Sequence, residues 1–232
     1  MGLAHSPRIV TDGLVLALDA GNTKSYPGSG TSWTDLSGNG NNGTLENDVG
    51  YDSGNGGALS FDGTDDYATL SSSQIAPGTG AFTWNFWAKH IPTAETGVGT
   101  KSVLFSGTGS NTLYGAVYMD SLTYGVFYYA TGYRIADYDT AFNDQWWHIA
   151  FVGNGGVSGS RTLKLYRNGV QAGSTYTYDY NFTSTTPYIG RNHSYAPEVM
   201  RGFMANATYY NRELTASEVE QNYNALRGRF GI

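Results

Sequence analysis

Two oxygen-rich loops are the first stretches of this sequence that could do chemistry. One runs from Asp35 to Asn42 and the other from Asp62 to Asp66. Hard cations such as Ca²⁺ bind several oxygen ligands from carboxylates, amides and backbone carbonyls. The loops therefore predict a structural calcium site, with Asp35, Asn39 and Asp66 as ligands. The alternative is that the aspartates form Asx-turns and the glycines only reverse the chain.

Tyrosines form the second candidate site. Tyr176, Tyr178 and Tyr180 alternate along one predicted strand, so they are expected to share a face. Aromatic rings stack on sugar rings while charged groups and amides bind the hydroxyls, which predicts a carbohydrate site. The candidate residues are Tyr124, Tyr128, Tyr133, Arg134, Asp137, Tyr176, Tyr178 and Tyr180. Tyrosine is also a good strand former and is enriched at interfaces, so a structural role and a protein interface remain alternatives.

The composition that must position these residues is glycine-rich, tyrosine-rich and poor in charge. The 232 residues include 32 glycines, 19 tyrosines and no cysteine, with a formal net charge of -6. The missing cysteine excludes a disulfide framework and a thiol nucleophile. The acidic balance provides no basic stripe for nucleic acid. No apolar run is long enough to span a membrane.

Short strands separated by tight turns dominate the pattern. Residues 81–89 alternate with aromatics on both faces, which predicts a strand buried on both sides. The residues 62–66 are predicted to close a hairpin, and Asn168-Gly169 is typical of a type I′ turn. Residues 20–57 are expected to be turns. The predicted strands are 13–19, 58–61, 67–70, 81–89, 102–106, 114–119, 122–130, 146–153, 162–167, 170–178, 187–190 and 202–210.

One helix is predicted near the C-terminus. Thr215 and Glu218 have the spacing of a capping box, and Gly228 is expected to end the helix. The apolar stripe of this helix comprises Val219, Tyr223 and Leu226. Because no linker or repeat interrupts the pattern, we expect an N-terminal arm over residues 1–12 and a single domain over 13–232.

Four segments resemble the laminin G-like branch of the concanavalin A-like lectin/glucanase superfamily. The resemblance implies an all-β fold, an antiparallel two-sheet jelly-roll sandwich with one short C-terminal helix. The segments, in chain order, are Leu59–Tyr67, Phe82–Lys89, Trp147–Val152 with Leu163–Gly169, and Tyr188–Arg191 with Gly202–Glu218.

A narrower resemblance lies in residues 13–28, 33–45 and 221–226. These stretches are similar to laminin G-like domains in virion proteins of tailed phages, including those of cyanobacteria. The resemblance implies a capsid decoration or a fibre or tail tip, made in the host cytoplasm without a signal peptide. Other virion proteins and host or environmental glycans are the expected partners, and a homo-oligomer on the virion is expected, with neither nucleic acid nor membrane as a partner.

Catalysis is not predicted. Glycosidases use a pair of carboxylates, and glucanases of the resembled superfamily carry them as Glu-x-Asp-x-Glu along one strand. The sequence has only Glu46-Asn-Asp48, with no third acid. The prediction is therefore a non-enzymatic glycan-binding module. A purely structural capsid or tail component is the alternative, and a glycoside hydrolase is the second alternative.

Overall fold

The computed structural model describes residues 7–71, 75, 77–91, 100–107, 114–120, 123–129, 133–138, 144–178, 186–192 and 198–232. For residues 100, 101, 114–120, 123–129, 133–138 and 178 it describes the backbone alone. Statements about structure below refer to these residues.

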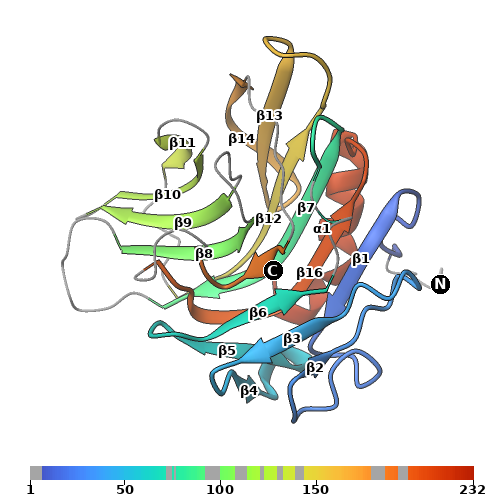
Figure 1. Ribbon diagram of the computed structural model, residues 1–232, viewed down its shortest axis with the longest axis vertical. Helices are drawn as coiled ribbons and strands as arrows, with labels where there is room; N and C mark the ends of the chain where they lie inside the picture. Colours follow the sequence, from blue (N-terminus) through green and yellow to red (C-terminus); the bar gives the residue numbers. More distant parts are fainter. Residues whose placement is uncertain are drawn as a thin grey trace.

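The described part of the chain forms two antiparallel sheets stacked as a sandwich, with one helix against the outer face of the first (Figure 1). The first sheet, sheet A, has the order β14-β13-β12-β7-β16-β5-β4, and β1 also pairs with β16. Its strands are β1 (Leu14–Asp19), β4 (Gly50–Asp52), β5 (Ala58–Asp62), β7 (Phe82–His90), β12 (Trp146–Gly153), β13 (Arg161–Arg167), β14 (Val170–Tyr178) and β16 (Arg201–Tyr210).

The second sheet, sheet B, has the order β11-β10-β9-β8-β15-β6-β3-β2. Its strands are β2 (Ser32–Trp33), β3 (Gly43–Glu46), β6 (Tyr67–Leu70), β8 (Thr100–Ser106), β9 (Tyr114–Asp120), β10 (Thr123–Tyr129), β11 (Tyr133–Tyr138) and β15 (Tyr188–Ile189). Together the sheets confirm the predicted all-β sandwich. The strands β2, β3 and β4 lie within residues 20–57, so the prediction that this whole stretch forms turns is wrong. The strand β11 was not predicted either.

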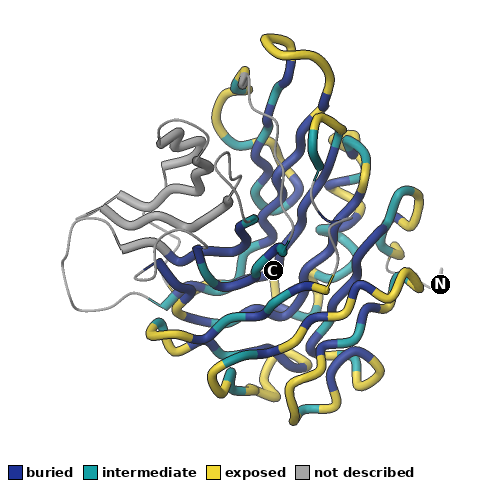
Figure 2. The backbone as a smooth tube through the Cα atoms, in the orientation of Figure 1, coloured by how far each residue is buried: buried dark blue, intermediate teal, exposed yellow. Residues whose placement is uncertain are grey.

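Strand β7 is buried on both faces, as predicted from its alternation. On the inner face, Trp84 and Phe86 stack with Phe105 of sheet B at centroid distances of 5.1 and 5.5 Å. On the outer face, Trp87 stacks with Phe230 of the helix at 4.3 Å. The strand is therefore the middle layer between two apolar interfaces, and Figure 2 shows its buried stretch in dark blue.

The predicted hairpin around residues 62–66 is wrong. β5 pairs with β16 and β4 in sheet A, whereas β6 pairs with β15 and β3 in sheet B. Both edges of each strand are occupied by strands other than its partner across the turn, so the turn carries the chain from one sheet to the other. Leu59 and Phe61 of β5 and Ala68 and Leu70 of β6 all face the same core, as they also would in a hairpin. A local turn signal therefore cannot distinguish a hairpin from a change of sheet.

Helix α1 (Ala216–Phe230) forms a third layer against sheet A. The predicted capping box is confirmed, with Thr215 accepting from the Glu218 amide and Glu218 accepting from the Thr215 amide. The predicted end at Gly228 is wrong. The helix continues because Phe230 packs on Trp87, and Gly231, at φ +73°, provides the left-handed cap.

The last residues of the N-terminal arm are tied to this layer. Asn222 of α1 accepts from the Val10 amide at 2.8 Å and donates to the Tyr210 hydroxyl, which itself donates to the Val10 carbonyl. Gln221 donates to the Arg8 carbonyl. The described part of the arm is thus fixed by hydrogen bonds to α1 and β16.

The asparagine-glycine turn between β13 and β14 has the predicted geometry. Asn168 and Gly169 both have positive φ, at 49° and 82°, and Arg167 pairs with Val170 across the turn. A type I′ turn requires two such residues, and Asn-Gly is the pair that adopts them at low cost.

A buried histidine lies beneath α1. His148 is 1% exposed between Trp87 and Tyr223, and neither ring nitrogen has a hydrogen-bond partner within the described structure. Burial lowers its pKa to about 3, and burial is also the main cause that lowers the pKa of His90 to about 4. Both imidazoles are therefore neutral in the folded protein near neutral pH.

We expect stability to fall on mild acidification, because the unfolded chain binds protons at these histidines first. Their folded pKa values lie below the ordinary value of about 6.5, so the free energy of unfolding decreases as pH drops below that value. Between pH 7.5 and 5.5 the loss should be about 1 kcal/mol for each histidine. Urea unfolding at the two pH values measures it, and His148→Leu should remove about half of the difference. If His148→Leu lost as much unfolding free energy between the two pH values as the wild type, the assignment of the pH dependence to His148 would be wrong.

Candidate functional site

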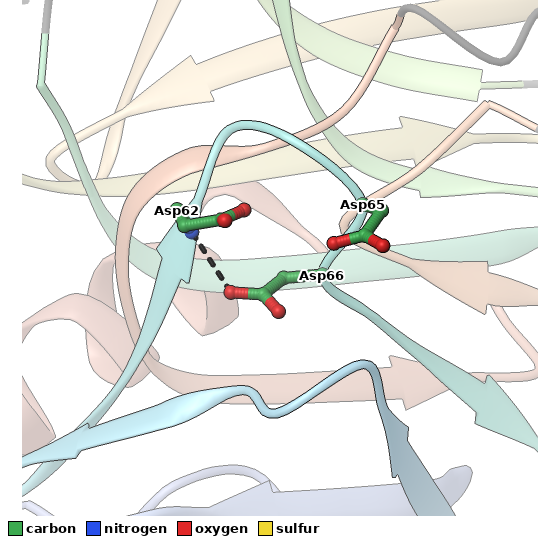
Figure 3. A group of neighbouring side chains, drawn as sticks. All are labelled: Asp62, Asp65 and Asp66. Carbon is green, nitrogen blue, oxygen red and sulfur yellow. Dashed lines mark hydrogen bonds between the residues drawn. The ribbon is translucent and has the colours of Figure 1, made fainter.

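Three carboxylates gather on the turn between β5 and β6. One ligand oxygen from each of Asp62, Asp65 and Asp66 lies within 4.8 Å of the others (Figure 3). Gly63, at φ +81°, lets the turn pass close to the Arg201 side chain, where a Cβ atom would lie 2.9 Å from that side chain. No ion pair within the described part of the chain involves these three aspartates. Within the described residues, their carboxylates are therefore not used up in direct ion pairs.

The pKa values of two of these carboxylates are shifted in opposite directions. Asp66 is buried and accepts from the Asp62 amide at 2.9 Å. Burial is the main cause that raises its pKa, and the charges of Asp62, Asp65 and Asp48 raise it further. Hydrogen bonds from backbone amides, that of Thr64 first, lower the pKa of Asp62. Asp62 and Asp65 are exposed, so these are the members that a solute can reach.

The predicted ligand Asp35 lies in the other loop, and both of its carboxylate oxygens accept hydrogen bonds from the protein. Its two oxygens accept from four donors: the amides of Ala17, Ser37 and Asn41 and the Ser37 hydroxyl. The side-chain amide of Asn39 donates to the carbonyls of Leu14 and Val15. These contacts hold the loop of residues 35–42 against β1.

The structure does not bring Asp35 and Asp66 together. Asp35 contacts the residues before Gly43, whereas Asp66 directly precedes Tyr67, which pairs with Glu46 at the other end of β3. A strand of four residues separates them by roughly 10 Å. The donor set on the 62–66 turn suits a hard cation, whereas Asp35 has no free oxygen to offer. Calcium binding itself stays a prediction.

An aromatic surface adjoins the acidic turn on the outer face of sheet B. The rings of Tyr67 and Tyr188 lie 5.7 Å apart, and the guanidinium carbon of Arg191 lies 4.4 Å from the Tyr67 ring and 5.6 Å from the Tyr188 ring. All three side chains are partly exposed. Their neighbours in the strands, Ala68 and Ile189, face the core, so the tyrosines face away from it. We call Tyr67, Tyr188 and Arg191 the tyrosine surface.

Most of the predicted carbohydrate residues lie on β10, β11 and β14. Tyr176 is half-buried and packs against the main core. Tyr180 lies outside the described residues, as do the side chains of Tyr124, Tyr128, Tyr133, Arg134, Asp137 and Tyr178. The backbone register pairs Tyr128 with Arg134 and Val126 with Asp137. Their role in sugar binding stays a prediction.

Sequence reasoning missed the tyrosine surface. Tyr67 alternates with core residues along β6, and Tyr188 precedes the buried Ile189, so alternation could have placed both on an outer face. What it could not show is the pairing of Tyr188 with Thr69, which joins two strands more than a hundred residues apart.

Residues 62–220 match the family model described as the concanavalin A-like lectin/glucanases superfamily, in its laminin G-like form. This match covers more than half of the chain, and the chain belongs to that superfamily. The two stacked antiparallel sheets agree with the assignment. None of the functionally curated proteins matches in sequence.

Several solved structures share the fold at low sequence identity. The binding domain of paraclostridial mosquitocidal protein 1 has a TM-score of 0.71 and 16% identity, covering 93% of this chain and 52% of that one. The sialidase of Trypanosoma rangeli has a TM-score of 0.67 and 18% identity, covering 95% of this chain and 34% of that one. Domain 4 of AbnA, a GH43 extracellular arabinanase of Geobacillus stearothermophilus solved with arabinotriose, has a TM-score of 0.62 and 16% identity, covering 94% and 100%.

The chain thus spans about half of the mosquitocidal protein structure and about a third of the sialidase, but all of the arabinanase domain. Identities this low show a shared fold and leave function to the site itself. In the described residues, no helix is both long and apolar enough to cross a membrane.

If the acidic turn binds calcium, millimolar Ca²⁺ should raise the melting temperature by a few degrees and EDTA should reverse the shift, because a ligand that binds only the folded state stabilises it. Asp65→Asn should remove the response without a loss of packing, since Asp65 is exposed. Differential scanning calorimetry measures both effects.

Asp35→Asn is the matched control for this prediction. It should lower the melting temperature, because an asparagine side chain cannot accept from all four donors and the unmet groups cost roughly 1–3 kcal/mol. It should keep the calcium response. If the calcium response were lost in Asp35→Asn and retained in Asp65→Asn, the cation would bind in the loop of residues 35–42 and not on the 62–66 turn.

Proposed function

We propose that this chain is a non-enzymatic glycan-binding module on a phage virion surface, as a capsid decoration or a fibre or tail tip. The lectin-type fold supports glycan binding, and the resemblance of residues 13–28, 33–45 and 221–226 to phage virion domains supports the location. The other expected partners are neighbouring virion proteins and further copies of the chain.

The tyrosine surface carries the proposal. Two partly exposed rings and a guanidinium group lie together on an outer sheet face, beside the exposed carboxylates of Asp62 and Asp65. Aromatic faces pack on the C–H face of a sugar ring, while charged groups at the edge bind its hydroxyls. Arg191 already stacks on Tyr67, so the ring and the donor are held in place before a sugar arrives. Pre-formed contacts of this kind reduce the entropy lost on binding.

The structural neighbours are consistent with this function. Domain 4 of AbnA was solved with arabinotriose, and the mosquitocidal protein structure is a binding domain. The Trypanosoma rangeli sialidase is an enzyme, but the chain spans only about a third of it.

A glycoside hydrolase is the second candidate, because Asp62 and Asp66 have pKa values shifted apart as an acid–base pair requires. The burial of Asp66 argues against it. Asp66 is 4% exposed and its carboxylate accepts from the Asp62 amide, so a substrate would have to displace the turn to reach it. We therefore favour binding without cleavage. Hydrolysis of a bound glycan that Asp62→Asn abolishes would support the enzyme.

Tyr67→Ala should lower the affinity for any glycan identified on an array by about tenfold, the equivalent of about 1.4 kcal/mol. The loss arises because one ring of the stacking pair and the support of Arg191 disappear together. Isothermal titration with the array-positive glycan measures it. Tyr51→Ala, an exposed tyrosine on β4 in sheet A, is the control and should leave the affinity unchanged.

The virion location has its own test. Antibodies raised against the purified domain should label intact phage particles in immunogold electron microscopy, at the capsid or at the tail. Particles that contain the chain in mass spectrometry but bind no antibody would place it inside the virion. Labelled particles, with a domain that binds nothing on a glycan array, would favour the purely structural alternative.

A further inference from the structure

A second aromatic surface lies on sheet A, on the face away from the core where helix α1 ends. A single row of cross-strand pairs builds it: Ser60 pairs with Phe203, Phe203 with Lys89, and Lys89 with Trp146. We call Trp146, Phe203 and Lys89 the tryptophan surface. All three are partly exposed, and the row crosses four neighbouring strands.

The orientation of Trp146 is fixed by its surroundings. Its ring nitrogen donates to the side-chain oxygen of Asn55 at 3.1 Å, and its ring lies 4.7 Å from Phe230 and 6.5 Å from Phe203. Asn55 is in turn held by Arg229, which donates to its carbonyl oxygen. The ring also packs against the apolar cluster that contains Trp87 and Phe230, so packing on one side and the hydrogen bond to Asn55 together fix its orientation while part of it stays exposed. The ring is therefore pre-positioned at the surface.

Within the described residues, the charge of Lys89 on this surface is balanced by Asp144. The Lys89 ammonium lies 2.7 Å from Asp144 Oδ1 and 5.6 Å from the centre of the Phe203 ring. The surface thus presents aromatic carbon, an amide and a neutralised ion pair. Such a surface suits a ligand that is itself uncharged, has one apolar face and carries hydroxyl groups at its edges. An anionic ligand would have to compete with Asp144 for Lys89.

We infer that the tryptophan surface is a second glycan-binding site, which takes a neutral hexose ring stacked on Trp146. The inference rests on the proposed glycan-binding function but uses a different surface. The tyrosine surface lies on the outer face of sheet B and this one on the outer face of sheet A, so one domain can contact two sugar residues on opposite sides. Two weak sites on one module raise the avidity for a dense glycan layer.

The experiment is a fluorescence titration with lactose, maltose and cellobiose, and with 3′-sialyllactose as an anionic probe. Trp33, Trp84 and Trp87 are at most 2% exposed, so a change in emission reports mainly on Trp146 and Trp147. At least one neutral disaccharide should change the emission of the wild type, and 3′-sialyllactose should bind at least tenfold more weakly. The change should persist in Tyr67→Ala and in the control Trp147→Phe, and disappear in Trp146→Ala.

A gentler variant protects the test against misfolding. Asn55 has φ 52°, which glycine adopts readily, so Asn55→Gly removes the hydrogen bond to Trp146 without straining the backbone. This variant should lower the affinity for the neutral disaccharide by about tenfold. An unchanged affinity in both Trp146→Ala and Asn55→Gly would overturn the inference.

The two proposals fail in different ways. If no neutral disaccharide changes the emission but Tyr67→Ala still abolishes array binding, the second site is wrong and the proposed function stands. If Trp146→Ala alone abolishes array binding, the second site stands and the tyrosine surface is wrong. If Trp146→Ala instead dissociates an oligomer in sedimentation velocity while sugar binding is unchanged, the surface is a protein contact and the inference is overturned.

Discussion

The burial of β7 on both of its faces is the constraint on which the rest of the structure depends. Its inner face carries Trp84 and Phe86 into the contact with sheet B, and its outer face carries Trp87 into the contact with α1. Aromatic side chains bury large areas and dominate the energetics of such interfaces. Because both faces of one strand are occupied, the sandwich needs a third layer, and helix α1 supplies it. The described part of the arm is then fixed to that helix by Asn222.

The turn between β5 and β6 links this architecture to function. It leaves sheet A and enters sheet B, so it must cross the edge of the sandwich instead of closing a hairpin. Crossing the edge places Asp62 and Asp65 in solvent and puts Tyr67 beside Tyr188, a strand neighbour far away in sequence. The buried Asp66 holds the turn by accepting from the Asp62 amide. One connection thus generates an acidic group and an aromatic pair at the same place.

Both proposed binding surfaces lie on outer sheet faces for a simple reason. In the described residues, the inner faces form one apolar core in which Trp84, Phe86 and Phe151 surround Phe105, and these rings are buried. Aromatic residues that face outward must be supported from the side instead. Arg191 does so for Tyr67, and Asn55 does so for Trp146. In each case a polar group holds the ring while leaving it partly exposed.

The sequence by itself determined the local features: the two-sided burial of residues 81–89, the Asn168-Gly169 turn, the capping box at Thr215 and the all-β class. These depend on alternation, on residues that tolerate positive φ and on short-range hydrogen bonds, all of which act within a few residues. Only the tertiary structure decided that residues 62–66 change sheets, that α1 runs on to Phe230, and that Asp35 and Asp66 lie at opposite ends of β3. Likewise, the pairs that make the two aromatic surfaces are set by strand register between distant segments. Register follows from how the whole core packs, and no local pattern encodes it.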